Sequence, residues 1–148
     1  MPAGWALASV AEVRLFLSDG AGVRELTTGD APVVRVTAPD LQRAQRARDR
    51  IRAERDDVAV VLDVTVAVAG DFRAARLAFA AAVQDGQAEA TIRYAGTVAG
   101  LAGLLDDIES AEVADGVTLI AAAPGQDLDR IGREVLRGLA SRDQARAS

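Results

Sequence analysis

The spacing of apolar residues divides this chain into short continuous runs and longer periodic segments that alternate along it. Four runs have the length and the branched, aliphatic composition of strands, and they lie at residues 12–17, 32–37, 58–69 and 117–122. β-branched residues favour strands, and a proline such as Pro32 fits the first position of a strand. Turn residues, among them Asp19-Gly20 and Pro124-Gly125, follow two of these runs. The pattern therefore predicts four strands.

Apolar residues at intervals of three and four predict helices between and after the strands. The clearest helix spans residues 38–55, where Leu41, Ala44 and Ile51 share a face and Asp40 lies near the start. A carboxylate at that position meets free N–H groups and the positive end of the helix dipole. Further helices are predicted at residues 71–84, from Gly96-Thr97 to Ile108, and at residues 128–139, with a short helical turn at residues 23–28.

A strand followed by a helical segment, repeated four times, is the unit of a parallel α/β sheet. The sequence thus predicts an α/β fold with a parallel four-stranded (βα)4 sheet, half of a TIM-type barrel, which takes about 250 residues when complete. We expect one domain at residues 12–140, preceded by a lead-in at residues 1–11 and followed by a polar tail at residues 141–148. A half barrel exposes two sheet edges and an apolar concave face. We therefore expect the sheet to be completed or covered by self-association, as a homodimer.

Composition excludes several classes of function. The net charge of −5 and the pI near 4.7 argue against a nucleic-acid partner. The sequence contains no Cys, His or Lys, so thiol nucleophiles, imidazole bases, Schiff-base lysines and the commonest metal ligands are excluded. No uncharged run reaches the length of a membrane span, and Glu12 follows too early for a signal peptide. We expect a cytoplasmic protein without a membrane partner and without a metal site.

Several short motifs resemble, in their order, the C-terminal half of the bacterial-luciferase-like flavin-dependent oxidoreductases, in particular their nitrilotriacetate-monooxygenase branch. The motifs are Arg24-Glu25-Leu26 before Ala31-Pro32-Val33-Val34, Gly96-Thr97 at a helix start, and Asp115-Gly116 before the last strand. The resemblance covers residues 12–140. It implies the last four βα units of a barrel enzyme.

In that family, the turn after the fifth barrel strand commonly holds the flavin phosphate. The resemblance places Ser18, Gly20 and Gly22 at this turn as candidate cofactor-binding residues for FMN or a deazaflavin. Free N–H groups at a helix start attract an anion, whereas the carboxylate of Asp19 repels one. The alternative is an ordinary glycine-rich turn, with no cofactor bound by the isolated chain.

Three hypotheses about function follow. The family's four N-terminal strands have no counterpart here, so the first is a truncated luciferase-like domain without an independent active site or catalytic residues, acting as a structural, binding or accessory protein. The second is a flavin- or deazaflavin-dependent oxidoreductase or monooxygenase, whose site is completed by a dimer mate or by a separate chain that supplies the N-terminal half. The third is a small-ligand binding module.

A polar group within the predicted strands is the candidate ligand pocket. Alternation along residues 58–69 places Asp63 and Thr65 on one face, opposite the face that meets the helices. Arg35, in the neighbouring strand, is expected to pair with Asp63, since a buried carboxylate needs a partner, and Thr118 is expected to join them. The alternative is an internal salt bridge that fixes the register of the strands.

Two charged helix segments are interpreted as solvated faces. One consists of the arginines of residues 43–55, and the other of Asp106, Asp107, Glu109 and Glu112.

Overall fold

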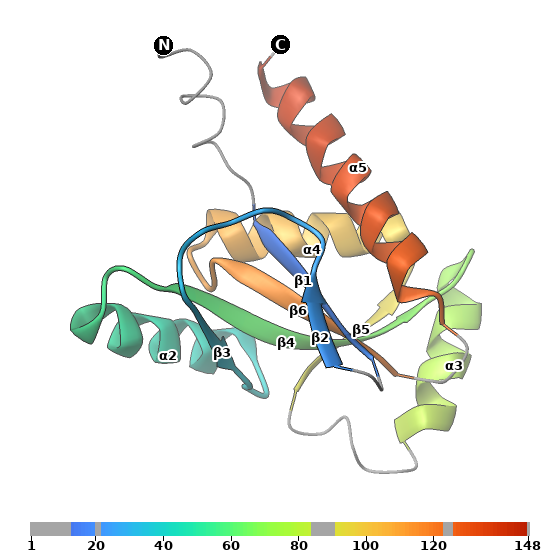
Figure 1. The fold of residues 1–148 in the computed structure, drawn as a ribbon. Coiled ribbons are helices and arrows are strands. Elements are labelled where there is room, and N and C mark those ends of the chain that lie inside the picture. Colours follow the sequence, from blue (N-terminus) through green and yellow to red (C-terminus); the bar gives the residue numbers. More distant parts are fainter. Residues whose placement is uncertain (1–12, 20–21, 84–90, 123–125, 148) are drawn as a thin grey trace.

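The computed structural model describes residues 13–19, 22–83, 91–122 and 126–147, and within these ranges the chain forms a curled mixed sheet with four helices (Figure 1). The elements are, in chain order, β1 (Arg14–Asp19), β2 (Gly22–Glu25), β3 (Val33–Val36), α2 (Leu41–Glu54), β4 (Ala59–Val68), α3 (Phe72–Val83), β5 (Ile92–Gly96), α4 (Val98–Ser110), β6 (Gly116–Ala121) and α5 (Leu128–Ala147). None of the described helices combines the length and the apolar character needed to cross a bilayer.

The six strands are ordered β2-β1-β6-β4-β3, and β5 also pairs with β4. β4 is the long central strand. Its first half, residues 59–62, pairs in parallel with β3, and residues 64–68 pair in parallel with β5 along the same edge. The other edge of β4 pairs in parallel with β6, which in turn pairs in parallel with β1. Only β2 runs antiparallel among the described strands, as the second arm of a hairpin with β1.

The predicted parallel (βα)4 half barrel is therefore wrong. In such a barrel, strands that follow one another in the chain pair with one another, and helices connect them. Here β1 is followed by an antiparallel strand instead of a helix, and its other neighbour is β6 from the end of the chain. The four predicted strands do exist, as β1, β3, β4 and β6, but two further strands and a different order change the fold.

Both missed strands correct local predictions. The helical turn predicted at residues 23–28 is wrong, because β2 occupies Gly22–Glu25 and Gly22 adopts the positive φ of 136° that favours glycine. The second missed strand, β5, lies immediately before the helix start that was predicted at Gly96-Thr97. α5 continues to Ala147, well beyond the predicted helix end at residue 139, and so includes most of the segment predicted as a polar tail.

The main core lies between one face of the sheet and the helices α2, α4 and α5. As alternation predicted, Leu62, Val64 and Val66 of β4 point to this side and belong to the core cluster. The other members of this cluster include Leu15, Leu17, Val117, Leu119, Leu101, Leu105, Ile108, Ile131 and Val135. Small residues bring α5 close, since a Cβ at Gly138 would lie 3.2 Å from the Cβ of Ala102. Burial of these aliphatic side chains is the main driving force for the fold.

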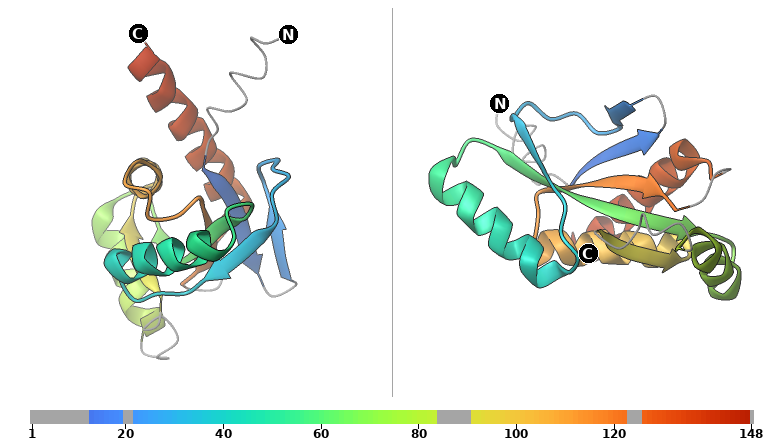
Figure 2. Two further views of the ribbon diagram at one scale, coloured as in Figure 1. Left: turned by 90° about the vertical axis from the view of Figure 1, so that its left-hand side faces the viewer. Right: turned by 90° about the horizontal axis from the view of Figure 1, so that it is seen from below.

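The helix α3 lies on the opposite face. Ile92 and Tyr94 of β5 pack into the main core, so Arg93 and Ala95 point to the other side, where they line a hollow with Arg76 and Ala80 of α3. The handedness of parallel connections explains this position. The chain crosses the sheet in one direction from β3 to β4 and in the other from β4 to β5, so right-handed connections place α2 and α3 on opposite faces. In the view from below, the two helices lie at opposite ends of the molecule (Figure 2).

Two predicted solvated faces are partly buried instead. Asp106 of α4 is 4% exposed, and its Oδ2 accepts a hydrogen bond from Arg142 Nε of α5 at 3.2 Å. Arg48 of α2 has a side chain that is 14% exposed, and it pairs with Asp115. The charges were predicted to face water because the helix partners could not be read from local spacing.

Candidate functional site

The predicted pair of Arg35 and Asp63 is confirmed. Arg35 Nε donates to Asp63 Oδ1 at 2.6 Å, and Thr37 Oγ1 donates to Asp63 Oδ2 at 3.0 Å. The Asp63 side chain is 8% exposed, so these bonds offset the cost of removing its charge from water. The Arg35 side chain is 41% exposed and forms the solvent side of the pair.

The other two predicted pocket residues share this face of the sheet. Thr118 lies beside Asp63 in the register of β4 and β6 and is buried. Thr65 places its Oγ1 2.6 Å from Thr91 Oγ1. The structure thus brings Arg35, Asp63 and Thr118 together, with bonds that also serve to hold the strands in register. A ligand pocket at these residues stays a prediction.

The same face bears on the predicted self-association. Arg14 and Glu25 lie on it, and Arg14 donates from Nε and Nη2 to the two carboxylate oxygens of Glu25 at 2.9 and 2.8 Å. Arg14 and Glu25 thus add a second ion pair to the face that carries the predicted Arg35–Asp63 pair. The homodimer and the N-terminal-half partner stay predictions.

The candidate flavin site falls on the β1–β2 hairpin. Gly20 lies outside the described residues. Ser18 and Gly22 lie on two antiparallel strands, where Ser18 pairs with Val23 and Asp19 with Gly22. In the described part of the chain, no helix follows β1 before Leu41, although Asp129 in the first turn of α5 pairs with Arg24 of β2. A flavin site at Ser18, Gly20 and Gly22 stays a prediction, and we derive no flavin chemistry from these residues.

A cleft of about 560 Å³ opens at the carboxyl edge of the sheet, where β4, β5 and β6 end. Three segments line it: Val68, Ala69 and Gly70 after β4; Thr97, Val98 and Ala99 after β5; and Gln126, Asp127, Arg130, Ile131 and Glu134 around the start of α5. We call this the carboxyl-edge cleft. Its walls combine apolar side chains with a few polar groups, which is typical of sites for small ligands.

Tyr94 and two glycines position the β5 side of the cleft. Thr97 is the N-cap of α4, and its Oγ1 accepts a hydrogen bond from Gly100 N at 3.3 Å. Tyr94 donates its hydroxyl to the Thr97 carbonyl oxygen at 2.7 Å. Burial raises the pKa of Tyr94. A Cβ at Gly96 or at Gly100 would overlap the Tyr94 hydroxyl, so both glycines make room for it.

The α5 side of the cleft carries its ionisable groups. Asp127 Oδ1 accepts a hydrogen bond from Arg130 N at 3.1 Å, which caps the helix. Arg130 Nε donates to Glu134 Oε1 at 3.1 Å across one helical turn. On the facing wall, a Cβ at Gly70 would meet no atom within 4 Å, so the exit of β4 is open.

Gln126 leaves a polar atom unsatisfied in the wall of the cleft. Its Nε2 donates to the Val68 carbonyl oxygen at 3.2 Å, whereas its Oε1 is buried and has no hydrogen-bond partner among the described residues. The contact with Val68 fixes the orientation of the amide, because a carbonyl oxygen accepts and cannot donate. An unsatisfied buried acceptor costs about 1–3 kcal/mol. Such groups are rare and need an explanation.

The topology explains why a cleft forms here. In open α/β sheets, ligands bind outside the carboxyl ends of adjacent strands whose following connections leave for opposite faces. β4 and β6 are adjacent and parallel, and β4 continues into α3 on one face while β6 continues toward α5 on the other. The carboxyl-edge cleft lies at this switch point.

Sequence analysis named Thr97, at the start of a helix, but none of the other residues of this cleft. Gly70, Thr97 and Gln126 each follow a strand, and that position is the signal that was available in the sequence. This position could not predict a cleft, because the sequence does not show that β4, β5 and β6 are neighbours.

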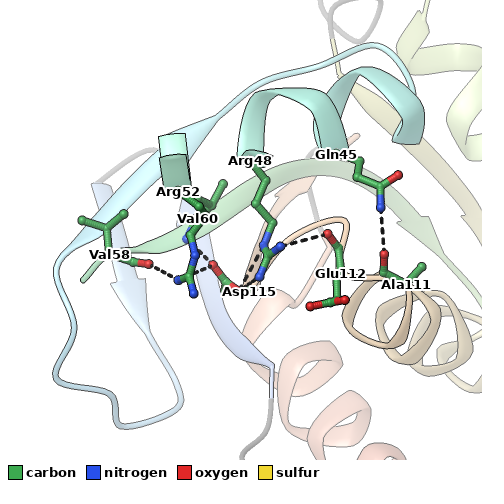
Figure 3. A network of polar contacts seen from close by, with 8 residues as sticks. All are labelled: Gln45, Arg48, Arg52, Val58, Val60, Ala111, Glu112 and Asp115. Carbon is green, nitrogen blue, oxygen red and sulfur yellow. Dashed lines mark hydrogen bonds and ion pairs between the residues drawn. The ribbon is translucent and has the colours of Figure 1, made fainter. Parts of the chain in front are cut away.

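The amino edge of the sheet carries a dense polar network (Figure 3). Asp115, just before β6, accepts hydrogen bonds at Oδ1 from Arg48 Nε and Nη2 at 3.3 and 3.0 Å, and at Oδ2 from Val60 N at 2.8 Å. Arg52 donates to the Val58 carbonyl oxygen at 2.8 Å. A hollow of about 960 Å³ adjoins this network. Because Arg48 and Asp115 bind each other in its wall, we interpret this region as structural.

No protein-family model matches the sequence, and a comparison with curated proteins finds no match either.

Proposed function

We propose that this chain is a small-ligand binding domain that holds its ligand in the carboxyl-edge cleft and has no independent catalytic machinery. The observation that carries the proposal is the coincidence of a cleft of about 560 Å³ with the switch point between β4 and β6. The topology provides a crevice at that position, and the side chains leave it open.

The groups that line the cleft are suited to binding. Val68, Val98 and Ile131 offer apolar contact, while Thr97 and Gln126 offer hydrogen bonds. Reactive side chains are few, because the chain has no Cys, His or Lys. The carboxylates that remain have structural partners, since Asp127 caps α5 and Glu134 binds Arg130.

The flavin-dependent oxidoreductase stays a second hypothesis without a structural observation in its favour. It rests on the resemblance to the luciferase-like family, which stays a prediction. Such an enzyme would take its redox chemistry from the flavin, and the protein would supply binding and orientation. FMN therefore belongs among the ligands to be tested.

The test is a screen of fragment-sized compounds against ¹⁵N-labelled protein, read by amide chemical shifts. We expect bound fragments to shift the amides of Gly70, Thr97 to Gly100 and Gln126 to Arg130 more than others. Shifts that concentrate at the amino-edge hollow or scatter over the surface would overturn the proposal.

A blocking variant makes the screen specific. Ala99→Trp places a large side chain at an exposed helix position that lines the cleft. It should abolish the binding of cleft fragments without unfolding the protein. Ala53→Trp, at an exposed position of α2 outside the cleft, is the matched control and should bind the same fragments as the unmodified protein.

A further inference from the structure

We infer that the carboxyl-edge cleft selects ligands with a cationic or neutral hydrogen-bond donor, such as a primary ammonium group, and rejects phosphate and carboxylate groups. The inference rests on the proposed function and deepens it by naming the class of ligand. Three features of the cleft lead to it.

The first feature is that a side-chain oxygen already caps each of the two helix starts at the cleft. Helix N-termini attract anions through free N–H groups and the positive end of the dipole. At α4 the side chain of Thr97 already accepts from Gly100 N, and at α5 the carboxylate of Asp127 already accepts from Arg130 N. A ligand phosphate at α5 would have to compete with that carboxylate and would be repelled by it.

The second feature is the charge of the lining. Its ionisable side chains are two carboxylates, Asp127 and Glu134, and one guanidinium, Arg130, which leaves a net charge of −1. Arg130 is neutralised by its contact with Glu134 at 3.1 Å, and its side chain is 75% exposed, so it extends toward solvent. Asp127 caps α5 but has no ion-pair partner among the described residues, so its carboxylate favours a cation.

The third feature is the unsatisfied acceptor. Gln126 Oε1 can only accept hydrogen bonds, and it is the described buried side-chain atom that has no partner. An ammonium or amide N–H of a ligand would satisfy it, whereas a deprotonated carboxylate or phosphate has no hydrogen to donate. Because Oε1 is buried, binding of such a donor requires a local adjustment.

A matched pair of probes tests the inference. Tryptamine and indole-3-acetate carry the same indole ring, which suits the apolar walls, and end in an ammonium and a carboxylate respectively. We expect tryptamine to bind at least about tenfold more tightly, a difference of about 1.4 kcal/mol. Titrations followed by the amide shifts of Gly70, Thr97 and Gln126 give both affinities and the place of binding.

The outcomes separate the inference from the proposed function. Tighter binding of indole-3-acetate in the cleft would overturn the inference and leave the binding function intact. Tighter binding of FMN than of riboflavin, which lacks the phosphate, would overturn it in the same way. If the fragment screen also finds no compound in the cleft, the proposed function fails together with the inference.

Two variants assign the selectivity to named atoms. Gln126→Met removes the acceptor at similar size and should weaken tryptamine about tenfold, a loss typical of a hydrogen bond to a charged group. Indole-3-acetate should be unaffected. Gln42→Met, at an exposed position of α2, is the control and should change neither affinity.

Asp127→Asn keeps an oxygen for the helix cap and should reduce the preference for tryptamine about threefold. An unchanged preference in both cleft variants would contradict the assignment.

Discussion

At the amino edge of the sheet, Asp115 binds Arg48 and the Val60 amide with both carboxylate oxygens, whereas at the carboxyl edge Gln126 leaves one buried acceptor without a described partner. Both edges bring polar groups together from distant parts of the chain. The amino edge joins α2, β4 and the α4–β6 turn through completed bonds. The carboxyl edge joins β4, β5 and α5 around an open cleft.

The difference separates stability from binding. A completed polar network contributes to folding, and removal of one partner leaves the others buried and unsatisfied. A buried polar group without a partner lowers the stability of the free protein. This cost is removed only when a ligand supplies the missing hydrogen bond. The two edges therefore predict different responses to substitution.

The largest effect is expected at the amino edge. Asp115→Ala removes the shared acceptor of Arg48, Arg52 and the Val60 amide, and should lower the free energy of unfolding by about 3 kcal/mol. Urea denaturation measures this change. Asp57→Ala is the matched control, because the Asp57 side chain is 67% exposed and its Oδ1 lies 3.9 Å from Arg55 Nε, near the limit of an ion pair. If Asp115→Ala lowers the free energy of unfolding by less than about 1 kcal/mol, the network stabilises the amino edge no more than an exposed ion pair would.

An intermediate effect with an unusual sign is expected at the carboxyl edge. Gly→Ala within a helix normally stabilises by about 1 kcal/mol, but a Cβ at Gly100 would overlap the Tyr94 hydroxyl. Gly100→Ala should therefore destabilise by about 1–2 kcal/mol. In a Tyr94→Phe background the hydroxyl is absent, and the same substitution should become stabilising. A double-mutant cycle of unfolding free energies checks the coupling, and additive effects would contradict it.

The smallest effect is a pH dependence that belongs to the amino edge. The hydrogen-bonded guanidinium of Arg14 lowers the pKa of Glu25 below its usual value. A lowered pKa in the folded state adds stability above the unfolded pKa of about 4.3, and this stability is lost as the pH falls through the folded value. Between pH 7 and about pH 3, the free energy of unfolding of Glu25→Gln should therefore fall less than that of the unmodified protein. The difference should be only about 1 kcal/mol, because the pair is partly buried.

The matched control for this pH effect is Glu54→Gln, at an exposed position of α2. Its unfolding free energy should follow that of the unmodified protein at each pH. If Glu25→Gln follows it as well, the Arg14–Glu25 pair does not contribute to the pH dependence.

The local sequence pattern was sufficient to predict most helices and strands. It was insufficient to predict which strands pair with one another. The valine-rich segment that became β4 and the Asp40-capped helix α2 were predicted because burial and capping act over a few residues. β2 was missed because Gly22-Val23-Arg24-Glu25 is largely exposed and has no apolar period. β5 was missed because five residues, Ile92–Gly96, are too few to distinguish a strand from the lead-in to a helix.

Strand order was the decisive gap. Nothing in the spacing of residues 14–19 and 116–121 indicates that these two segments pair, since the pairing is decided by competition among all strands. The Arg35–Asp63 pair was accessible because a central carboxylate in an apolar strand requires a partner. The cleft residues were not accessible, because their significance depends on three strand ends being neighbours.

The pairing of β4 also has a consequence for the order of events in folding. Among the described parallel strands, β3, β5 and β6 all hydrogen-bond to β4, and β1 joins the sheet through β6. Until residues 59–68 are extended and in place, these partners have no template, so β4 should already be formed in the transition state. Substitutions in β4 such as Val64→Ala should therefore slow folding, and those in β2 such as Val23→Ala should mainly accelerate unfolding, a contrast that φ-values measure. We therefore expect the strands on both sides of β4 in the sequence to join the sheet only after β4 has formed.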